Sequence, residues 1–260
     1  MLDDASIEAH YDRAVEAYAA SARGPLREHR TWPTSRDLLP ELDGARVLDA
    51  GCGPGVHTAT MADAGATVEG IDLSKAMIEH ARAEYGDRAT FTHGDVRSDL
   101  DEREPDAFDA LLCQLTLSHV ADLDPVFAGV AHVLRPGGVA VVVGHHPLFD
   151  HLVVRDRTYP QPPGAFEAGI DPEVLVDRHP PRYHETEPYA IRWAPAAEPV
   201  RYYRRPMSAL IESPTDAGFT IDRIVEATPD ETFRAERPDV AAAMAELPPE
   251  IMGLRASLPN

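Results

Sequence analysis

Three glycines stand within five positions of the segment VLDAGCGPG, which covers residues 47–55. Glycines at this spacing let a backbone turn tightly and approach a ligand more closely than a Cβ would allow. A dinucleotide-binding loop would carry a small residue where Val56 stands, and a P-loop would continue into Lys followed by Ser or Thr. The pattern therefore predicts a ligand-binding loop and weakens both phosphate-binding interpretations.

Two carboxylates follow the loop at the ends of predicted strands. Asp72 comes 21 residues after Gly51, a position from which an acid can accept hydrogen bonds from both hydroxyls of a ribose. Asp95 ends the next strand within the sequence GDV, where its carboxylate suits an adenine amino group and Val96 suits the ring. The loop and the two acids together predict an adenosine that lies across the carboxyl edge of a sheet.

The elements that must hold these residues alternate regularly from about residue 46 onward. Apolar strand patterns are separated by helical patterns of about ten residues, which predicts right-handed crossovers and a mostly parallel sheet covered on both faces. The predicted strands cover residues 45–50, 67–72, 89–95, 107–113 and 139–144, and the predicted helices cover 57–65, 74–86 and 124–134.

Four regions follow from this pattern. Residues 1–40 are expected to form a helical lid with a Pro- and Gly-interrupted middle and a short helix at 36–39, and residues 41–145 form the core. Residues 146–206 hold 11 of the 24 prolines and eight of the 17 aromatic residues without a clear period, which favours an insertion that covers the substrate. Residues 207–260 are expected to add a helix, a strand at 220–227, a helix near 239–246 and a last strand.

These motifs resemble the class I S-adenosylmethionine-dependent methyltransferases. The matching segments are VLDAGCGPG, VEGIDLSKAMIEHAR, HGDV, FDALLCQLTLSHV and VLRPGG; they cover residues 40–145 well and residues 217–227 more loosely. The resemblance implies a Rossmann-like, doubly wound α/β fold. Its sheet would have seven mostly parallel strands with an antiparallel last strand, and the insertion would follow the fifth strand.

The resemblance also implies S-adenosyl-L-methionine as the cofactor and suggests the residues that bind it. Asp49 and the loop would surround the methionine tail, Asp72 would hold the ribose, and Gln114 would lie near the sulfonium. The adenine would lie against Leu73, Met77 and Val96, with Asp95 at its edge. The full predicted cofactor set is Asp49, Gly51, Cys52, Gly53, Asp72, Leu73, Met77, Asp95, Val96 and Gln114.

Methyl transfer to a good nucleophile needs little beyond proximity and desolvation, so no side chain has to act as a nucleophile. An acceptor that must lose a proton would benefit from a histidine base, and His119 and His146 follow the fourth and fifth predicted strands. No metal site is predicted, and His57 and His80 are expected to face solvent from their helices. The predicted substrate-binding residues are Tyr18, His145, Tyr202 and Tyr203.

The composition is strongly acidic. Asp and Glu total 44 against 24 Lys and Arg, the formal net charge is −20, and Lys75 is the one lysine. A GC-rich genome would explain the shortage of lysine, but a salt-rich cytosol is the favoured hypothesis. At about 1 M salt the Debye length is about 3 Å, so an acidic surface repels itself only weakly there. No basic stripe favours binding to nucleic acid.

No apolar run is long enough to span a membrane, and the acidic N-terminal segment lacks a signal-type apolar stretch, so a cytoplasmic protein is expected. Cys52 and Cys113 are interpreted as reduced, buried thiols. The favoured function is in-line methyl transfer to a small-molecule acceptor, driven mainly by proximity. Three alternatives stay open: an NAD(P)-dependent oxidoreductase, a non-catalytic S-adenosylmethionine-binding protein and, less favoured, RNA or protein methylation. The oligomeric state is also open.

Overall fold

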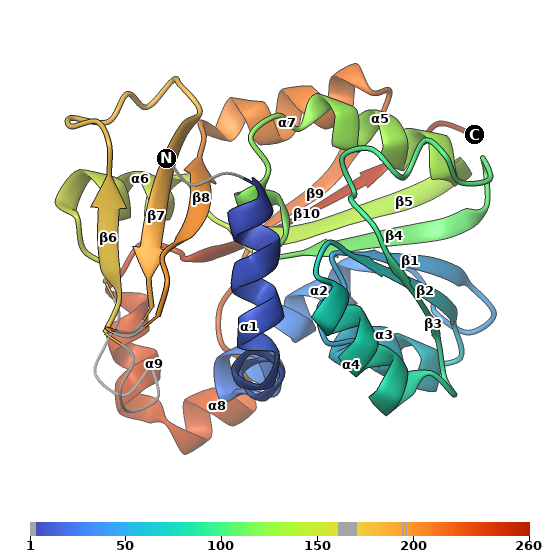
Figure 1. The fold of residues 1–260 in the computed structure, drawn as a ribbon, viewed down its shortest axis with the longest axis horizontal. Coiled ribbons are helices and arrows are strands. Elements are labelled where there is room, and N and C mark those ends of the chain that lie inside the picture. Colours follow the sequence, from blue (N-terminus) through green and yellow to red (C-terminus); the bar gives the residue numbers. More distant parts are fainter. Residues whose placement is uncertain (1–3, 161–170, 194, 196) are drawn as a thin grey trace.

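A sheet of seven strands runs through the molecule in the order β3-β2-β1-β4-β5-β10-β9 (Figure 1). The computed structural model describes residues 4–160, 171–193, 195 and 197–260. The first five strands are parallel, and β10 is antiparallel to both of its neighbours, β5 and β9. The predicted sheet with an antiparallel last strand is therefore confirmed. The strands are β1 (Arg46–Ala50), β2 (Thr67–Asp72), β3 (Thr90–His93), β4 (Phe108–Gln114), β5 (Leu134–His145), β9 (Thr220–Glu226) and β10 (Ile251–Ser257).

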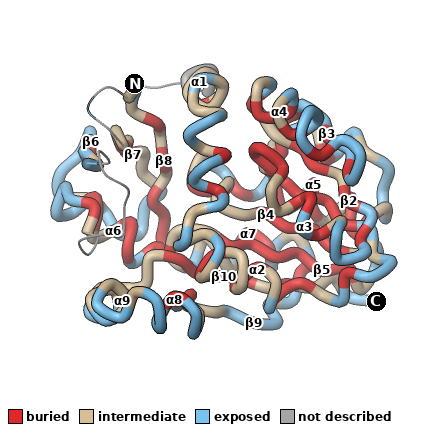
Figure 2. The backbone as a smooth tube through the Cα atoms, turned by 90° about the horizontal axis from the view of Figure 1, so that it is seen from below, coloured by how far each residue is buried: buried red, intermediate tan, exposed pale blue. Residues whose placement is uncertain are grey.

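Helices cover both faces of this sheet, and each face has its own apolar core. The first core lies beneath α2 (Trp32–Leu38), α3 (Val56–Asp63) and α4 (Lys75–Tyr85). The second lies beneath α5 (Asp124–Val133) and α7 (Met207–Asp216), on the opposite side in Figure 1. The middle strands are buried along most of their length because both their faces are covered, whereas β9 at the edge is largely exposed (Figure 2).

The N-terminal region is more helical than predicted. α1 (Asp4–Ala22) is followed by the π-helix η1 (Arg27–Thr31), which runs directly into α2, so the expected short helix at 36–39 begins earlier. Pro25 and Pro33 caused the error, because both lie within helical segments. Pro25 stands at the start of its segment, where its missing N–H would have no intrahelical partner. Pro33 lies where η1 passes into α2.

The described residues of the insertion (146–160, 171–193, 195 and 197–206) form regular elements rather than an aperiodic loop. It contains α6 (Pro147–Asp156) and a three-stranded antiparallel sheet, β6 (Glu173–Val176), β7 (Glu187–Arg192) and β8 (Val200–Arg204). A third apolar core joins α6 to this small sheet through Phe149, Val153, Tyr189, Ile191 and Tyr202. Much of the aromatic content that drew attention in the sequence therefore packs the insertion itself.

The C-terminal region completes the large sheet, with α8 (Glu231–Glu236) and α9 (Pro238–Ala245) between its last two strands. One helix near 239–246 was expected, and α8 is an addition. Asp230 begins α8 because its side chain accepts a hydrogen bond from the Phe233 amide, a common N-cap arrangement. Within the described ranges, no helix combines the length and apolar character needed to cross a membrane.

Candidate active site

A cavity opens at the carboxyl ends of β1, β2, β3 and β4, and α1 crosses in front of this edge (Figure 1). It encloses about 700 Å³ including its open mouth, within the range of cofactor sites. Ligands bind at this edge of open α/β sheets because the strand order reverses there. Its lining consists of Ile7, Tyr11, Tyr18, Gly51, Gly53, Asp72, Leu73, Met77, Asp95, Val96, Arg97, Gln114, Leu115, Thr116, His119 and Val120.

Eight of the ten predicted cofactor residues line this one cavity. Seven of them lie at or just after the ends of β1, β2, β3 and β4, and Met77 lies near the start of α4, so the structure brings together groups that are far apart along the chain. These residues are Gly51, Gly53, Asp72, Leu73, Met77, Asp95, Val96 and Gln114.

Backbone hydrogen bonds fix the glycine loop against the end of β2. The amides of Gly51 and Cys52 both donate to the Ile71 carbonyl, 2.7 and 3.0 Å away, which ties the loop to β2. Gly51 has φ +82°, and a Cβ added there would lie 2.0 Å from the Thr116 Oγ1. Gly53 has φ +54°, and a Cβ there would lie 3.5 Å from the Tyr18 ring. Both positions favour glycine in conformation, and Gly51 also has no room for a side chain.

Asp72 joins the loop to the second strand. Its Oδ2 accepts a hydrogen bond from the Gly53 amide and its Oδ1 accepts one from the Ser74 amide, both at 2.8 Å. Burial raises the pKa of this carboxyl, although the two amides act in the opposite direction. Each oxygen keeps a lone pair, so the carboxylate can still accept hydrogen bonds from a ligand's hydroxyls.

Asp95 already has a cationic partner in Arg97. The guanidinium Nε lies 2.9 Å from each carboxylate oxygen, and Arg97 itself lines the cavity. Burial opposes ionisation of Asp95, but the bonds with Arg97 outweigh it and hold the pKa of the carboxyl below its usual range. The predicted bond to an adenine amino group stays a prediction, because it would have to share this carboxylate with Arg97.

Asp49 and Cys52 do not line the cavity. The Asp49 carboxylate is buried and accepts a hydrogen bond from the Thr58 hydroxyl at 2.6 Å. Burial raises its pKa to about 7, which reduces the negative charge that a ligand's ammonium would meet. The Cys52 thiol is also buried, and burial raises its pKa. Their predicted contacts with a methionine tail therefore stay predictions that the present geometry does not favour.

His119 lies on the wall of the cavity, and its tautomer follows from its partners. Nδ1 is 2.6 Å from the Arg201 carbonyl oxygen, which can only accept, so Nδ1 carries the proton. Burial lowers the pKa of the ring to about 4, so Nε2 is unprotonated at neutral pH. It accepts the hydroxyl of Tyr11 at 2.7 Å. The Arg201 carbonyl thus orients the ring of His119, and the Tyr11 hydroxyl from α1 occupies the Nε2 atom that would act as the base.

Gln114 also lies on the wall of the cavity and has two polar partners. Its Oε1 lies 2.7 Å from the Ser35 hydroxyl, and its Nε2 lies 2.9 Å from Nδ1 of His57. His57 also stacks on Trp32, with ring centroids 4.9 Å apart. The expectation that His57 faces solvent is wrong, because Trp32 from α2 covers it. Burial lowers its pKa to about 4.

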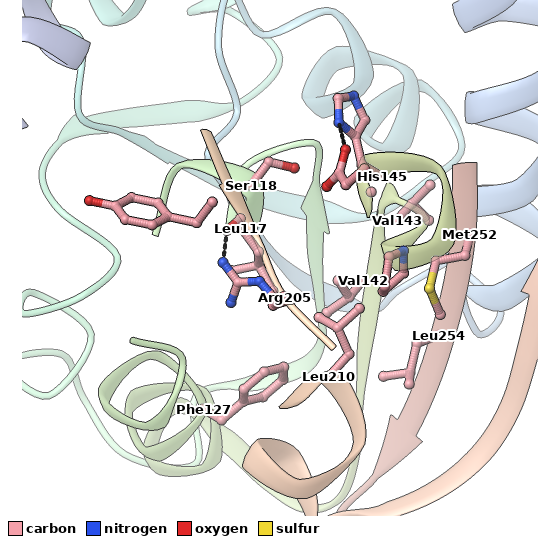
Figure 3. Close-up of a pocket in the computed structure, with 14 residues that line it drawn as sticks. Leu117, Ser118, Phe127, Val142, Val143, His145, Arg205, Leu210, Met252 and Leu254 are labelled. Atoms are coloured by element: carbon pink, nitrogen blue, oxygen red, sulfur yellow. Dashed lines mark hydrogen bonds and ion pairs between the residues drawn. The ribbon is translucent and has the colours of Figure 1, made fainter. Parts of the chain in front are cut away.

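Four predicted residues of the insertion edge lie outside this cavity. Tyr202 contacts His119 at a centroid distance of 4.6 Å and stacks on His145, so it is one side chain away from the lining. His145 lies 3.1 Å from the Asp150 carboxylate and, with Tyr203, lines a second, smaller cavity (Figure 3). His146 begins α6, where its Nδ1 accepts the Leu148 amide. A catalytic role for His146 therefore lacks support from its position.

Several lining residues were missed by the sequence interpretation. Tyr11 is not one of these, because its seven-residue spacing from Tyr18 on one face of the N-terminal helix placed both tyrosines in the predicted lid. Leu115 has φ +59°, an uncommon conformation for a residue with a side chain, and no sequence signal marks it. In the described part of the chain, no cluster of His, Cys, Asp and Glu could hold a metal ion.

The fold and the cavity agree with comparisons to known proteins. A model described as "Methyltransferase domain" matches residues 47–138. Residues 47–138 thus match a methyltransferase domain, and the seven-stranded sheet with its antiparallel β10 is the class I S-adenosylmethionine-dependent methyltransferase fold.

Among curated relatives, the ubiquinone biosynthesis O-methyltransferase of Xanthomonas campestris pv. campestris is 39% identical over 123 residues, which are 45% of this chain and 52% of the relative. The chain thus matches about half the length of such relatives.

Solved structures share the fold over more of the chain. An S-adenosylmethionine-dependent methyltransferase from Mesorhizobium loti superposes with a TM-score of 0.62 at 24% identity, covering 87% of this chain and 96% of the other. The [4+2]-cyclase SpnF superposes with a TM-score of 0.61 at 20% identity, covering 98% and 96%.

Proposed function

We propose that this protein transfers a methyl group from S-adenosyl-L-methionine to an oxygen of a small-molecule acceptor. One observation carries the proposal: Gly51, Gly53, Asp72, Asp95 and the neutral His119 line a single cavity. The matched curated relatives are named as O-methyltransferases, which supports oxygen as the accepting atom.

The cavity fits the proposed donor. Gly51 and Gly53 line the cavity without side chains, so a ligand could approach the backbone of the loop closely. Asp72 would bind the ribose hydroxyls, and Leu73, Met77 and Val96, which line the same cavity, would form an apolar surface for the adenine. The bound donor supplies a methyl group already activated by its sulfonium.

The chain's own contribution is orientation, exclusion of water and acceptance of a proton. α1 covers the cavity and brings Tyr11 onto His119, so an acceptor hydroxyl that replaces the Tyr11 hydroxyl would meet Nε2 directly. As the acceptor oxygen bonds to the methyl carbon and the carbon–sulfur bond breaks, its proton moves to Nε2. A histidine with a pKa near 4 is a weak base, so proximity supplies most of the effect.

The other functions considered are less well supported. The loop places Val56 where a dinucleotide fold needs a small residue, which disfavours an NAD(P)-dependent oxidoreductase. A non-catalytic binding protein would not need an oriented histidine beside the ligand. The net charge of −20 disfavours a nucleic-acid substrate. We also place the protein in the cytoplasm, because the buried, unpaired Cys52 and Cys113 suit a reducing compartment.

A ligand panel tests the donor, because a ligand selective for the native state raises the melting temperature. We expect S-adenosylhomocysteine to raise it and NAD(H) to leave it unchanged. Production of S-adenosylhomocysteine from S-adenosylmethionine with a set of phenols then tests turnover. Stabilisation by NAD(H) alone would reject the proposal. Turnover has to be measured as well as binding, because SpnF, which shares the fold, is named as a [4+2]-cyclase.

A further inference from the structure

The second cavity lies at the carboxyl end of β5, beside the cavity proposed for the methyl donor (Figure 3). It encloses about 540 Å³ including its open mouth, which is within the range of small-molecule sites. The short helix η2 (Leu117–His119) separates the two cavities, because His119 lines the donor cavity whereas Leu117 and Ser118 line the second one. The proposed function leaves this second cavity without a role.

Arg205 is the cation of the second cavity. It is only 5% exposed, and its Nη2 donates to the carbonyl oxygens of Leu117, at 3.0 Å, and of Val120; Figure 3 shows the bond to Leu117. Its Nε and Nη1 have no hydrogen-bond partner among the described residues, and neither atom is sealed from solvent. Because Arg205 lines the cavity and is otherwise buried, these two donors open onto the cavity.

No described carboxylate lies within ion-pair distance of Arg205. The preceding residue shows that the fold can supply one, since Arg204 is also buried and pairs with Glu187. Burial lowers the pKa of Arg205 to about 10, so its guanidinium stays charged at neutral pH. A buried charge without a partner is costly, and an anionic ligand would therefore stabilise it.

Asp150 lines the same cavity, but its carboxylate already has partners. Its Oδ1 lies 3.1 Å from Nδ1 of His145 and accepts the Tyr189 hydroxyl at 2.8 Å. Burial opposes protonation of His145, but the attraction of Asp150 outweighs it and raises the pKa of the ring. Asp150 attracts Arg205 only from beyond ion-pair distance. His145 thus offsets the charge of Asp150, and the charge of Arg205 is left for a ligand.

Apolar side chains make up much of the remaining wall. They come from η2, α5, β5, α7 and β10, and they are Leu117, Phe127, Val142, Leu210, Met252 and Leu254. A small inorganic anion would leave this surface uncovered. A carboxylate attached to an apolar body would bind the cation and also bury apolar surface, so an organic acid matches both parts of the cavity.

We propose that the second cavity binds a small organic acid, with its carboxylate on Arg205 and its apolar body against Phe127, Val142 and Leu210. Nε and Nη1 can donate charge-assisted hydrogen bonds to a carboxylate, and such bonds are roughly twice as strong as neutral ones. Because η2 separates the two cavities, the acid and the methyl donor bind at the same time. The inference goes beyond the proposed function and does not depend on it, since its test needs no methyl donor.

Calorimetry on the full-length protein compares benzoate with benzamide, which has the same ring but no charge. Arg205→Gln removes the cation. Leu210→Phe adds bulk to the cavity from α7 and leaves the bonds between Arg205 and η2 in place. Arg155→Gln, at an exposed arginine of α6, is the control. Melting temperatures of the unliganded proteins check that each variant folds.

We expect wild type to bind benzoate at least about 10-fold more tightly than benzamide, the effect of one hydrogen bond to a charged group. Arg205→Gln and Leu210→Phe should each weaken benzoate by at least about 10-fold, and Arg155→Gln should bind it like wild type. Saturation with S-adenosylhomocysteine should leave benzoate binding unchanged.

Three results would overturn the inference: no binding of benzoate, equal affinities for benzoate and benzamide, or benzoate binding that Leu210→Phe leaves unchanged. Displacement of benzoate by S-adenosylhomocysteine would also overturn it, because the acid would then lie in the donor cavity. If Arg205→Gln does not fold, the benzamide comparison and Leu210→Phe decide. A protein that binds benzoate as expected but no S-adenosylhomocysteine would support this inference and reject the proposed function.

Discussion

Asp72 performs two tasks at the scale of a single residue: it fixes the glycine loop through the Gly53 amide and leaves lone pairs for a ligand. Asp72→Ala removes both, and we expect affinity for S-adenosylhomocysteine to fall 10- to 100-fold, because hydrogen bonds to a charged group are worth about 1.5–3 kcal/mol. Calorimetry measures the loss, with Asp63→Ala as a control at an exposed acid. Unchanged affinity would reduce Asp72 to a structural residue of the loop.

Gly51 permits a sharper test because the chain provides a matched control. Gly44 also has positive φ, +75°, but a Cβ there would meet nothing within 4 Å. Gly44→Ala should cost about 1–2 kcal/mol of unfolding free energy from backbone conformation alone. Gly51→Ala has the same conformational cost, and its methyl group would in addition clash with Thr116. We therefore expect chemical denaturation to show a larger loss for Gly51→Ala, together with loss of nucleoside binding. Equal losses would show that Thr116 moves aside freely.

His57 should make stability depend on pH. Its folded pKa of about 4 is below the unfolded value of 6.5, so only the unfolded chain takes up a proton between these values. Its contribution is present above pH 6.5 and is lost as the pH falls toward 4. Between pH 7 and pH 5 we expect the unfolding free energy of His57→Gln to fall by about 2 kcal/mol less than that of wild type.

Denaturation curves at pH 7 and pH 5 measure the unfolding free energies of wild type and His57→Gln. Comparing the change with pH in each protein cancels the cost of losing the stack on Trp32, because that cost is the same at both pH values. Asp49 acts in the opposite direction, because its raised pKa favours the protonated folded state below about 7. That contribution is common to both proteins and cancels. An equal loss of unfolding free energy in wild type and His57→Gln would contradict a half-buried His57 that stays neutral.

At the scale of elements, α1 closes the cavity through contacts that the sequence did not specify. Tyr11 touches Tyr18 and His119 through its ring and donates its hydroxyl to His119. Tyr11→Phe keeps the ring contacts and removes the hydrogen bond, which is worth about 1 kcal/mol. We expect faster dissociation of S-adenosylhomocysteine, roughly fivefold, in stopped-flow displacement. Tyr203→Phe, which loses a hydroxyl beside the other cavity, is the control. Identical rates would show that α1 is not a lid.

The insertion reaches the site through Tyr202, whose ring contacts both His119 and His145. Its other aromatic residues join α6 to the small sheet. The sequence suggested a cover made by the whole segment, and this role stays a prediction. The geometry favours a narrower version, in which the small sheet supports Tyr202 and the Arg201 carbonyl behind His119.

At the scale of the whole molecule, the net charge of −20 should make folding depend on salt. The Debye length is about 10 Å at 0.1 M salt and about 3 Å at 1 M, so carboxylates repel one another much more strongly in dilute buffer. We expect a lower melting temperature and a less compact chain below about 0.5 M potassium chloride. Circular dichroism and light scattering across a salt series measure this. Equal melts in dilute and molar salt would contradict the halophilic hypothesis.

The sequence by itself determined the sheet, the loop and the acids at two strand ends. These depend on local rules: apolar periodicity defines strands and helices, and glycines and acids at strand ends mark the ligand edge. Eight of ten predicted cofactor residues consequently line one cavity. The expectation from local rules was wrong at Pro25 and Pro33. The energetic cost of a proline depends on its position within a helix, and tertiary contacts help to decide where that helix begins.

Only the tertiary structure decided which side chains meet. Tyr11 and His119 are 108 positions apart, and their hydrogen bond exists because α1 packs across the strand ends. His57 is half-buried because Trp32 stacks on it. The burial of a side chain and its hydrogen-bond partners depend on residues far away in the sequence, so a local sequence pattern cannot predict them. The charge state of this site therefore follows from packing rather than from composition.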